Sequence, residues 1–267
     1  MLGESANIAD RAQLRAELGL DAPLLQQWTE FHSRLLRLDF GVSLYSKKPI
    51  AATLAGRIPW TFLLALASLG VAIMIAAPLG VLAALRPNTK WDTIAATVSL
   101  LGVSIPNFLL GPLLIIIFSI GLGWFPVSGT DRVTSIVLPS LTLGASLAAI
   151  LSRMIRASLL EVLSEEYIVS ARARGLSAVA VVIYHAIPNA VLPVITVLGL
   201  QLGALLGGAV ITEMIFAWPG VGQLTIEAIQ RRDYPLVQAC VLVISFAYVA
   251  VNTVTDLIYA WVDPRIG

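Results

Sequence analysis

Long runs of uncharged, apolar residues alternate with short polar segments along this chain. The runs long enough to cross a membrane cover roughly 60–85, 94–120, 134–152, 190–212 and 236–261. A hydrocarbon core about 30 Å thick needs about 20 apolar residues per helix, because the helix must satisfy its backbone hydrogen bonds internally. The pattern therefore predicts an all-α fold, a polytopic membrane helix bundle with five spans in this chain.

Composition supports this prediction and sets one part of the chain apart. The sequence is 58% apolar and 12% charged, with a mean hydropathy of +0.87, whereas soluble domains carry about 25% charged residues. The polar residues concentrate before the first run. We therefore divide the chain into an N-terminal segment, 1–58, and a transmembrane domain, 59–267, and we expect a short amphipathic helix over 10–20.

Basic residues in the short loops predict the orientation, because such loops face the cytoplasm. The loop 86–92 and the segment 153–189 both carry Lys or Arg, and two crossings separate them, so they share a face. We place 153–189 and the C-terminus in the cytoplasm and the N-terminal segment outside. That segment begins with no signal peptide, so we expect one more span before Met1, which makes six in the natural protein.

The sequence lacks the motifs of nucleotide binding. Neither a G-x-x-x-x-G-K-[ST] phosphate loop nor a G-x-G-x-x-G after a strand occurs, so the chain has no visible means of binding ATP or a dinucleotide. Its one cysteine, Cys240, lies in the last span and is expected to pack as an apolar thiol. The histidines are His32 and His185, and His185 has no second ligand at metal spacing, so we predict no metal site and no catalytic residue.

The segment 153–189 is longer than a turn between two spans requires. No Asp, Glu, Lys or Arg occurs from Leu176 to Thr212, a run that exceeds the roughly 20 residues of one span. Pro188 and Pro193 divide this run, because proline removes a helix donor and clashes with the preceding turn.

We therefore predict a helix that ends near Arg174, a turn at Gly175, and a short apolar helix over Ser177 to Tyr184, with the next span after Pro188. The short helix has no Lys or Arg to contact lipid headgroups, as an interfacial helix would. A groove on a partner protein is the favoured environment, and the membrane surface is the alternative.

The sequence A-R-A-R-G at 171–175, followed by H-A-I-P at 185–188, resembles the cytoplasmic EAA loop of bacterial ABC importer permeases. Further blocks are similar to the dipeptide, oligopeptide and nickel branch of that family, and together they span nearly the whole chain. These blocks are LGLDAPLLQQW, LDFGVSLYSKKPI, YIVSARARGL, ITEMIFAWPGVGQLTIEAIQRRDYPLVQ and NTVTDLIYAWVDPRIG. Two positions depart from the loop pattern. Val169 stands where the triplet has an acidic residue, so Glu166 should not inherit its salt bridge, and His185 stands where Ile is usual.

The resemblance implies a permease subunit of the bacterial inner membrane, which forms half of a translocation path for peptides or related small solutes. Its implied partners are a second homologous permease, two cytoplasmic ATPase subunits and an extracytoplasmic substrate-binding protein. ATP and Mg²⁺ would bind the ATPase subunits, so this chain would bind no cofactor and would not itself be an enzyme; no nucleic acid is expected. The implied ATPase-coupling residues are Ala171, Arg172, Ala173, Gly175, Leu176 and Pro188.

Two further groups of residues are candidates for function. Gly199, Gly203 and Gly207 recur every four residues and predict a close helix seam, either within the bundle or with the partner permease. Between the last two spans, a Pro-Gly turn precedes an amphipathic helix, and this region is a candidate outer gate or binding-protein contact; an interfacial helix is the alternative. The residues concerned are Pro219, Gly220, Arg231, Arg232 and Asp233.

Glu213 and Asp256 are the carboxylates nearest the apolar runs. Charge near a membrane core suggests function by default, and we expect both side chains to reach water or a partner. Structural capping or ion pairing is the favoured role, and a place on the translocation path is the alternative. An ion-coupled secondary transporter using either residue is the competing function, although no clear internal repeat and no central carboxylate support it.

Overall fold

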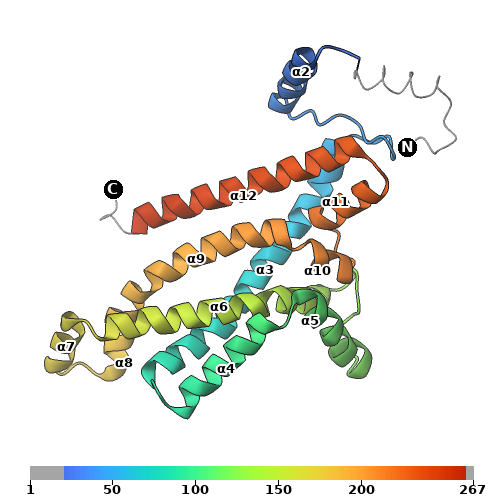
Figure 1. The fold of residues 1–267 in the computed structure, drawn as a ribbon. Helices are drawn as coiled ribbons and strands as arrows, with labels where there is room; N and C mark the ends of the chain where they lie inside the picture. Colours follow the sequence, from blue (N-terminus) through green and yellow to red (C-terminus); the bar gives the residue numbers. More distant parts are fainter. Residues whose placement is uncertain (1–20, 263–267) are drawn as a thin grey trace.

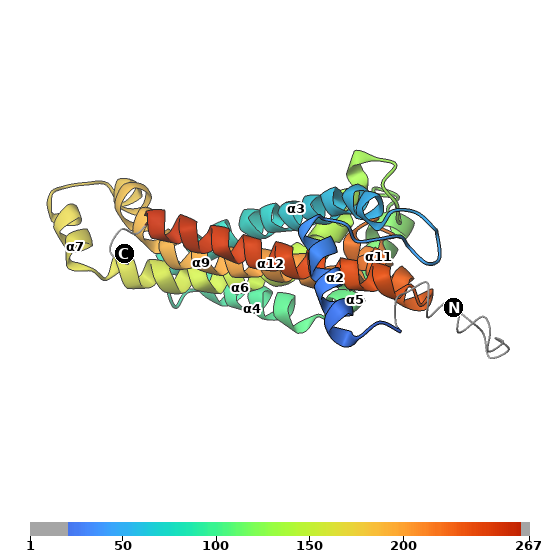
Figure 2. The ribbon, with the colours of Figure 1, turned by 90° about the horizontal axis from the view of Figure 1, so that it is seen from above.

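Long helices that run side by side form an elongated bundle in this computed structural model (Figures 1 and 2). The structure describes residues 21–262, and it describes the side chains of all of these except 207, 208 and 259–262. Four helical stretches are long and apolar enough to cross a membrane, and a bent pair of helices would make a fifth span. The four are built on α3 (Ile50–Leu85), α6 (Val137–Leu163), α9 (Ile187–Gly208) and α12 (Tyr234–Val262). The predicted all-α membrane bundle is confirmed.

The span predicted over 94–120 is not one straight helix. It consists of α4 (Lys90–Ser104), then α5 (Asn107–Leu114) with the π-helical η1 (Ile115–Gly121), and the two parts meet at an angle of 102°. Pro106 explains the break, because a proline pushes the residue before it out of the helical region. Ile105 accordingly has the extended angles φ −89° and ψ 114°.

Two helices also extend beyond the apolar runs that predicted them. Helix α3 begins at Ile50, so residues 50–58, which we assigned to the N-terminal segment, are the first turns of the first long helix. Helix α6 continues to Leu163, well past the expected end of its span at 152. Arg57 near the start of α3 and Arg153 and Arg156 in α6 interrupt the uncharged runs, while the helical hydrogen bonding of the backbone continues past them.

Helices α3 and α6 form the centre of the bundle and approach each other closely. A Cβ atom built at Gly80 of α3 would lie 2.7 Å from the Ser152 carbonyl oxygen, and one at Gly144 of α6 would lie 2.9 Å from the Ser68 carbonyl oxygen. Glycine at both positions therefore permits the backbones to touch. Helix α9 packs on α6 and carries α12 on its other side.

The short helices collect at the two ends of the bundle (Figures 1 and 2). Near one end lie α2 (Leu24–Leu36), α10 (Val210–Ile215) and α11 (Val221–Gln230), with η2 (Val133–Ile136) preceding α6. At the other end lie α7 (Glu166–Ala173), α8 (Ala178–Val181) and η3 (Val182–Ala186), on the side where α12 ends. The helix predicted over 10–20 and the span expected before Met1 lie outside the described residues.

Candidate functional site

The segment between α6 and α9 projects from the end of the bundle as two short helices joined by a tight turn. Gly175 has φ +82°, and its N–H donates to the Arg172 carbonyl oxygen at 3.0 Å. Glycine adopts this left-handed conformation without steric cost. The predicted helix end near Arg174 and the predicted turn at Gly175 are confirmed.

One face of this projecting segment is buried against the bundle. Ile168 and Ala171 of α7 and Val181 of α8 are each at most 1% exposed, and they pack with Ala84 of α3 and Leu159 of α6. Ala171 therefore lies on the face that fixes the segment to the bundle, and its role in ATPase coupling stays a prediction.

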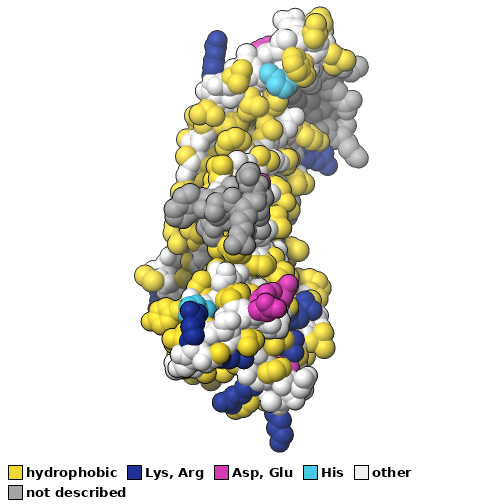
Figure 3. Space-filling model, turned by 90° about the vertical axis from the view of Figure 1, so that its left-hand side faces the viewer, with side chains coloured by type: hydrophobic (Ala, Val, Ile, Leu, Met, Phe, Trp, Pro, Cys, Tyr) yellow, Lys and Arg dark blue, Asp and Glu magenta, His cyan; other side chains and the backbone are white. Residues whose placement is uncertain are grey.

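The opposite face of the segment is exposed and largely apolar. Val179 and Tyr184 are 67% and 74% exposed, and Val169 and Ile183 are also exposed. Seen from this end of the molecule, the lower part shows basic and acidic side chains between hydrophobic ones (Figure 3). The remaining implied coupling residues are exposed as well, namely Arg172, Ala173, Gly175, Leu176 and Pro188. An exposed apolar patch bordered by charge is typical of a protein-binding surface.

The predicted break at Pro188 is wrong. Helices α8, η3 and α9 follow one another without interruption, and Pro188 lies in the first turn of α9. The preceding turn, Val182–Ala186, is a π-helix. Such a wider turn is how a helix absorbs a local irregularity, here the missing N–H and the bulky ring of proline.

Polar groups near this segment make mostly local contacts. The Asn189 amide donates to the His185 carbonyl oxygen at 2.8 Å, and no ion pair within residues 21–262 involves Glu166. Partial burial and the charge of Glu165 raise the pKa of the Tyr167 phenol above its ordinary value.

An ion pair that sequence reasoning missed joins α4 to α6 at this end. The Arg156 Nε and NH2 groups donate to the two carboxylate oxygens of Asp92, at 2.6 and 2.7 Å, and the Asn88 N–H donates to the same carboxylate at 2.9 Å. Asp92 is 7% exposed. The two residues lie 64 positions apart, so no local pattern could pair them.

Changing Asp92 to Asn should lower the free energy of unfolding by about 1–2 kcal/mol, because charge-assisted bonds to Arg156 become neutral ones. Chemical denaturation of the detergent-purified chain measures this difference. Exchange of Glu30, whose carboxylate pairs with Arg34 on the exposed surface of α2, for Gln serves as the control and should change it little. Equal losses for the two variants would contradict the structural role of the Asp92 pair.

At the other end of the bundle, the N-terminus of α11 is capped by residues from two other helices. Gly220 precedes the helix and offers no side chain to cap it. Instead, the Gln223 N–H donates to Glu213 Oε2 at 2.8 Å, and the Val221 N–H donates to Thr61 Oγ1 at 2.8 Å. The Thr61 hydroxyl in turn donates to Glu213 Oε1 at 2.9 Å. Because a helix N-terminus attracts negative charge, a carboxylate suits this position.

Glu213 is fully buried, which corrects the expectation that its side chain reaches water. Its carboxylate fills the space beside Gly220, where an added Cβ would overlap it. The adjoining Trp218 is 2% exposed, donates its indole N–H to the Trp60 carbonyl oxygen at 2.9 Å, and packs edge-to-face on the Trp60 ring. The turn before α11 is thus anchored to α3, and capping is the role that the structure assigns to Glu213.

Asp233, the carboxylate in the predicted outer gate or binding-protein contact, is also engaged within the chain. Asp233 is 1% exposed and accepts hydrogen bonds from the Ser43 hydroxyl and from the Leu44 and Tyr45 N–H groups, the latter two at 3.2 and 3.4 Å. This carboxylate therefore fastens the N-terminal segment to the start of α12 and is not presented to a partner. Pro219 is half-buried and Gly220 buried, while Arg231 and Arg232 are exposed.

The predicted glycine seam lies inside the chain, between α9 and α12. A Cβ at Gly199 would overlap the Thr255 side chain, and one at Gly203 would lie 3.0 Å from Asn252 Oδ1 and 3.1 Å from the Tyr248 ring. The surroundings of Gly207 are outside the described side chains. Of the two seams left open by the sequence, the structure selects the one within the bundle.

Two remaining candidates have simple environments. Cys240 is 0% exposed and packs with Ile50 and Leu54, as an apolar thiol was expected to do. Asp256 is exposed near the end of α12. Neither belongs to a group of three or more metal-ligating side chains, since no such group occurs among residues 21–262.

A family profile described as "Binding-protein-dependent transport system inner membrane component" matches residues 76–267, which include α4 to α12. The chain belongs to this family. It is 42% identical over 253 residues to the glutathione transport system permease protein GsiC of Escherichia coli strain K12, across 95% of this chain and 83% of that protein. The relative of the same name from Shigella dysenteriae serotype 1 shows the same identity and coverage.

Solved structures of importer permeases have the same fold as this permease. A chain of the MetNI methionine ABC transporter, in an inward-facing conformation, superposes with a TM-score of 0.68 at 22% identity, over 79% of this chain and 96% of that one. A chain of an amino acid ABC transporter solved with histidines superposes with a TM-score of 0.62 at 13% identity, over 78% of this chain and 93% of that one. The protein is thus an ABC importer permease of the bacterial inner membrane, and the secondary-transporter alternative is rejected.

Proposed function

We propose that this permease pairs with a second homologous permease to form the path for small peptides or related solutes. In this arrangement two ATPase subunits dock on the segment that contains α7 and α8, and an extracytoplasmic binding protein delivers solute at the end that carries α11. ATP and Mg²⁺ bind the ATPase subunits, and this chain binds no cofactor. The N-terminal segment lies outside and the C-terminus in the cytoplasm.

The exposed face of the projecting segment is the observation that carries this proposal. One side of α7 and α8 is fixed to the bundle core through Ile168 and Val181, while the other side leaves Val179 and Tyr184 uncovered. A segment that is rigidly attached on one face and free on the other can transmit the motion of a partner to α3 and α6. A loose loop would absorb that motion.

The proposed substrate class follows the relatives. Two relatives that share 42% of this sequence are named glutathione transport permeases, and the sequence resembles the peptide branch of the family. Glutathione is itself a small peptide. A short peptide or a similar small solute is therefore the substrate class most consistent with both observations.

Changing Gly175 to Trp should remove most of the ATPase that co-purifies with the permease. Apart from its two chain neighbours, no residue within 21–262 has an atom within 4 Å of the position that a Cβ would take at Gly175, so the new side chain begins in open space. It would instead point toward the docked partner, and its left-handed backbone would be strained by about 1–2 kcal/mol. The measurement is affinity purification of the tagged permease, co-expressed with candidate ATPase subunits.

Gly175→Asn is the matched control, because asparagine tolerates the left-handed conformation and is small. It should retain most of the bound ATPase. ATPase recovered equally with the Trp variant would remove Gly175 from the interface, and no ATPase with the unmodified permease would refute the proposed docking altogether. Circular dichroism of each variant checks that the helices persist.

A further inference from the structure

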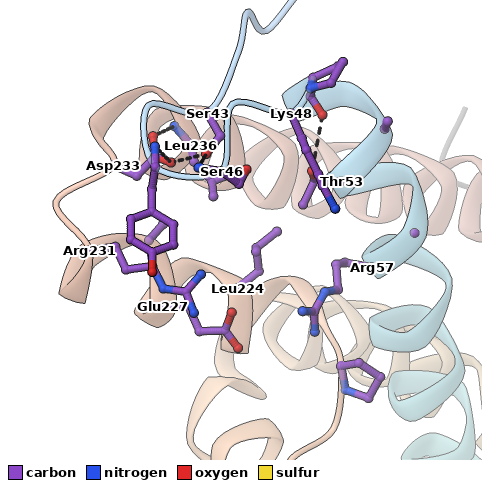
Figure 4. Close-up of a pocket in the computed structure, with 16 residues that line it drawn as sticks. Ser43, Ser46, Lys48, Thr53, Arg57, Leu224, Glu227, Arg231, Asp233 and Leu236 are labelled. Carbon is purple, nitrogen blue, oxygen red and sulfur yellow. Dashed lines mark hydrogen bonds between the residues drawn. The ribbon is translucent and has the colours of Figure 1, made fainter.

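A cavity of about 570 Å³ opens at the end of the molecule that carries α11 (Figure 4). The N-terminal segment after Ser43 forms one wall, and the first turns of α3 and the length of α11 form the others. Figure 4 shows the side chains of Arg57, Glu227 and Arg231 directed into the same space. Chain segments about 170 residues apart in sequence therefore build one site, and its volume is within the range of small-molecule sites, about 300–1,000 Å³.

Three basic side chains from separate segments line this cavity, namely Lys48, Arg57 and Arg231. None of them forms an ion pair within residues 21–262. The Arg231 guanidinium lies over the Tyr45 ring, 4.6 Å from its centroid, and this contact leaves its N–H donors free to bind an anion. Unpaired basic groups that converge on one space favour an anionic ligand.

The lining contains two acidic side chains, and only one of them is free. The Asp233 carboxylate is already held by Ser43 and the neighbouring backbone N–H groups. Glu227 makes no hydrogen bond or ion pair with residues 21–262 that would satisfy it. The cavity thus offers free groups of both charges, and it also offers apolar contact through Ala52 and Leu224.

We propose that this outer cavity is a binding site for a zwitterionic, peptide-like solute on its way into the permease. The carboxylate of the solute binds Arg57, Arg231 and Lys48, its ammonium group binds Glu227, and its side chains rest on the apolar lining. This inference deepens the proposed function and rests on it, because it names the charge type of the imported solute and the residues that receive it.

The size of the cavity distinguishes this solute from a contact with the binding protein. A single acidic side chain from a docked protein would fill only a small part of about 570 Å³ and would leave the remaining cations and Glu227 unsatisfied. A short peptide offers a carboxylate, an ammonium group and apolar atoms together. The mixture of charges in the lining therefore favours the solute.

The test measures equilibrium binding of radiolabelled trialanine to the full permease complex in nanodiscs, without binding protein. N-acetyl trialanine, which lacks the ammonium group, and trialanine amide, which lacks the carboxylate, serve as the matched ligands. Arg57→Gln should weaken the binding of trialanine and of its N-acetyl form about tenfold, and should leave the amide unaffected. Glu227→Gln should weaken trialanine and the amide, and should leave the N-acetyl form unaffected.

Arg132→Gln is the control, because Arg132 is an exposed cation that does not line the cavity; it should change no affinity. Absence of saturable trialanine binding, or equal effects on all three ligands, would overturn the inference. The inference would also be overturned if the Arg57 and Glu227 variants lost affinity for the binding protein but not for trialanine, because the cavity would then be a docking contact. ATPase recovered in a complex that does not bind trialanine would show that the inference fails while the proposed docking holds. A complex without ATPase would show that the proposed docking itself fails.

Discussion

Replacing Glu213 with alanine is expected to lower the free energy of unfolding of the permease by about 3 kcal/mol. The change leaves the Gln223 N–H and the Thr61 hydroxyl without their acceptor in a buried site, and each orphaned donor costs about 1–3 kcal/mol. It also empties the space beside Gly220 that the carboxylate fills. The N-terminus of α11 loses its cap at the same time.

Chemical denaturation of the purified permease in detergent measures this loss, and tryptophan fluorescence follows it well because Trp218 and Trp60 lie beside the site. Glu213→Gln is the matched control. It keeps the shape of the side chain and one acceptor oxygen, so it should lose clearly less than the alanine variant. Alanine and glutamine variants of equal stability would show that the hydrogen bonds contribute little.

A double-mutant cycle with Thr61→Val separates the two parts of this cap. Thr61 both donates to Glu213 and accepts from the Val221 N–H. If the three groups act as one network, the double variant should lose less than the sum of the single losses, with an interaction energy of about 1 kcal/mol. Additive losses would mean that Thr61 of α3 and Glu213 of α10 hold the N-terminus of α11 independently of each other.

The long helices could be predicted because lipid imposes one rule on every residue that it contacts. Apolar runs identified the four helical stretches long enough to cross a membrane, and the start of α12 at Tyr234 was placed within two residues. The start of α3 and the end of α6 were placed less well, because Arg57, Arg153 and Arg156 interrupt the uncharged runs that defined the spans.

Local backbone chemistry explains both a success and an error near the projecting segment. Gly175 could be assigned to a turn because its place between two helical patterns requires a left-handed residue. Pro188 was read as a break, but a π-helical turn just before it keeps the helix continuous. Pro106, which does break a span, carried the same signal and was overlooked.

The caps and ion pairs could not be predicted, because they join residues far apart in sequence. Thr61 and Glu213 are 152 positions apart, and Ser43 and Asp233 are 190 apart. The sequence marked Glu213 only as a carboxylate near an apolar run, and Asp233 only as part of a candidate outer gate or binding-protein contact. The partners of Glu213 become identifiable once α3, α10 and α11 pack together, and those of Asp233 once the segment before α3 lies against the start of α12.

Replacing Gly199 with leucine is expected to lower the free energy of unfolding by about 3 kcal/mol, through separation of α9 from α12. Even a Cβ atom at this position would overlap the Thr255 side chain, and forced overpacking in a close helix contact typically costs about 1–3 kcal/mol. Leucine adds three more carbon atoms in the same direction. Denaturation of the detergent-purified chain measures the loss.

Alanine substitutions along the bundle provide the controls for this seam. Gly70 lies inside α3, and beyond the adjoining turns of its own helix no atom of the described residues lies within 4 Å of a Cβ position, so Gly70→Ala should stabilise the helix by about 0.5–1 kcal/mol. Gly199→Ala should instead destabilise the protein by about 2 kcal/mol. Thr255→Ala added to it should recover part of the loss, since that change removes the hydroxyl and methyl that would overlap the new Cβ. Equal effects of alanine at Gly70 and Gly199 would contradict close packing of α9 on α12, because both substitutions would then report only the gain in helix propensity from Gly to Ala.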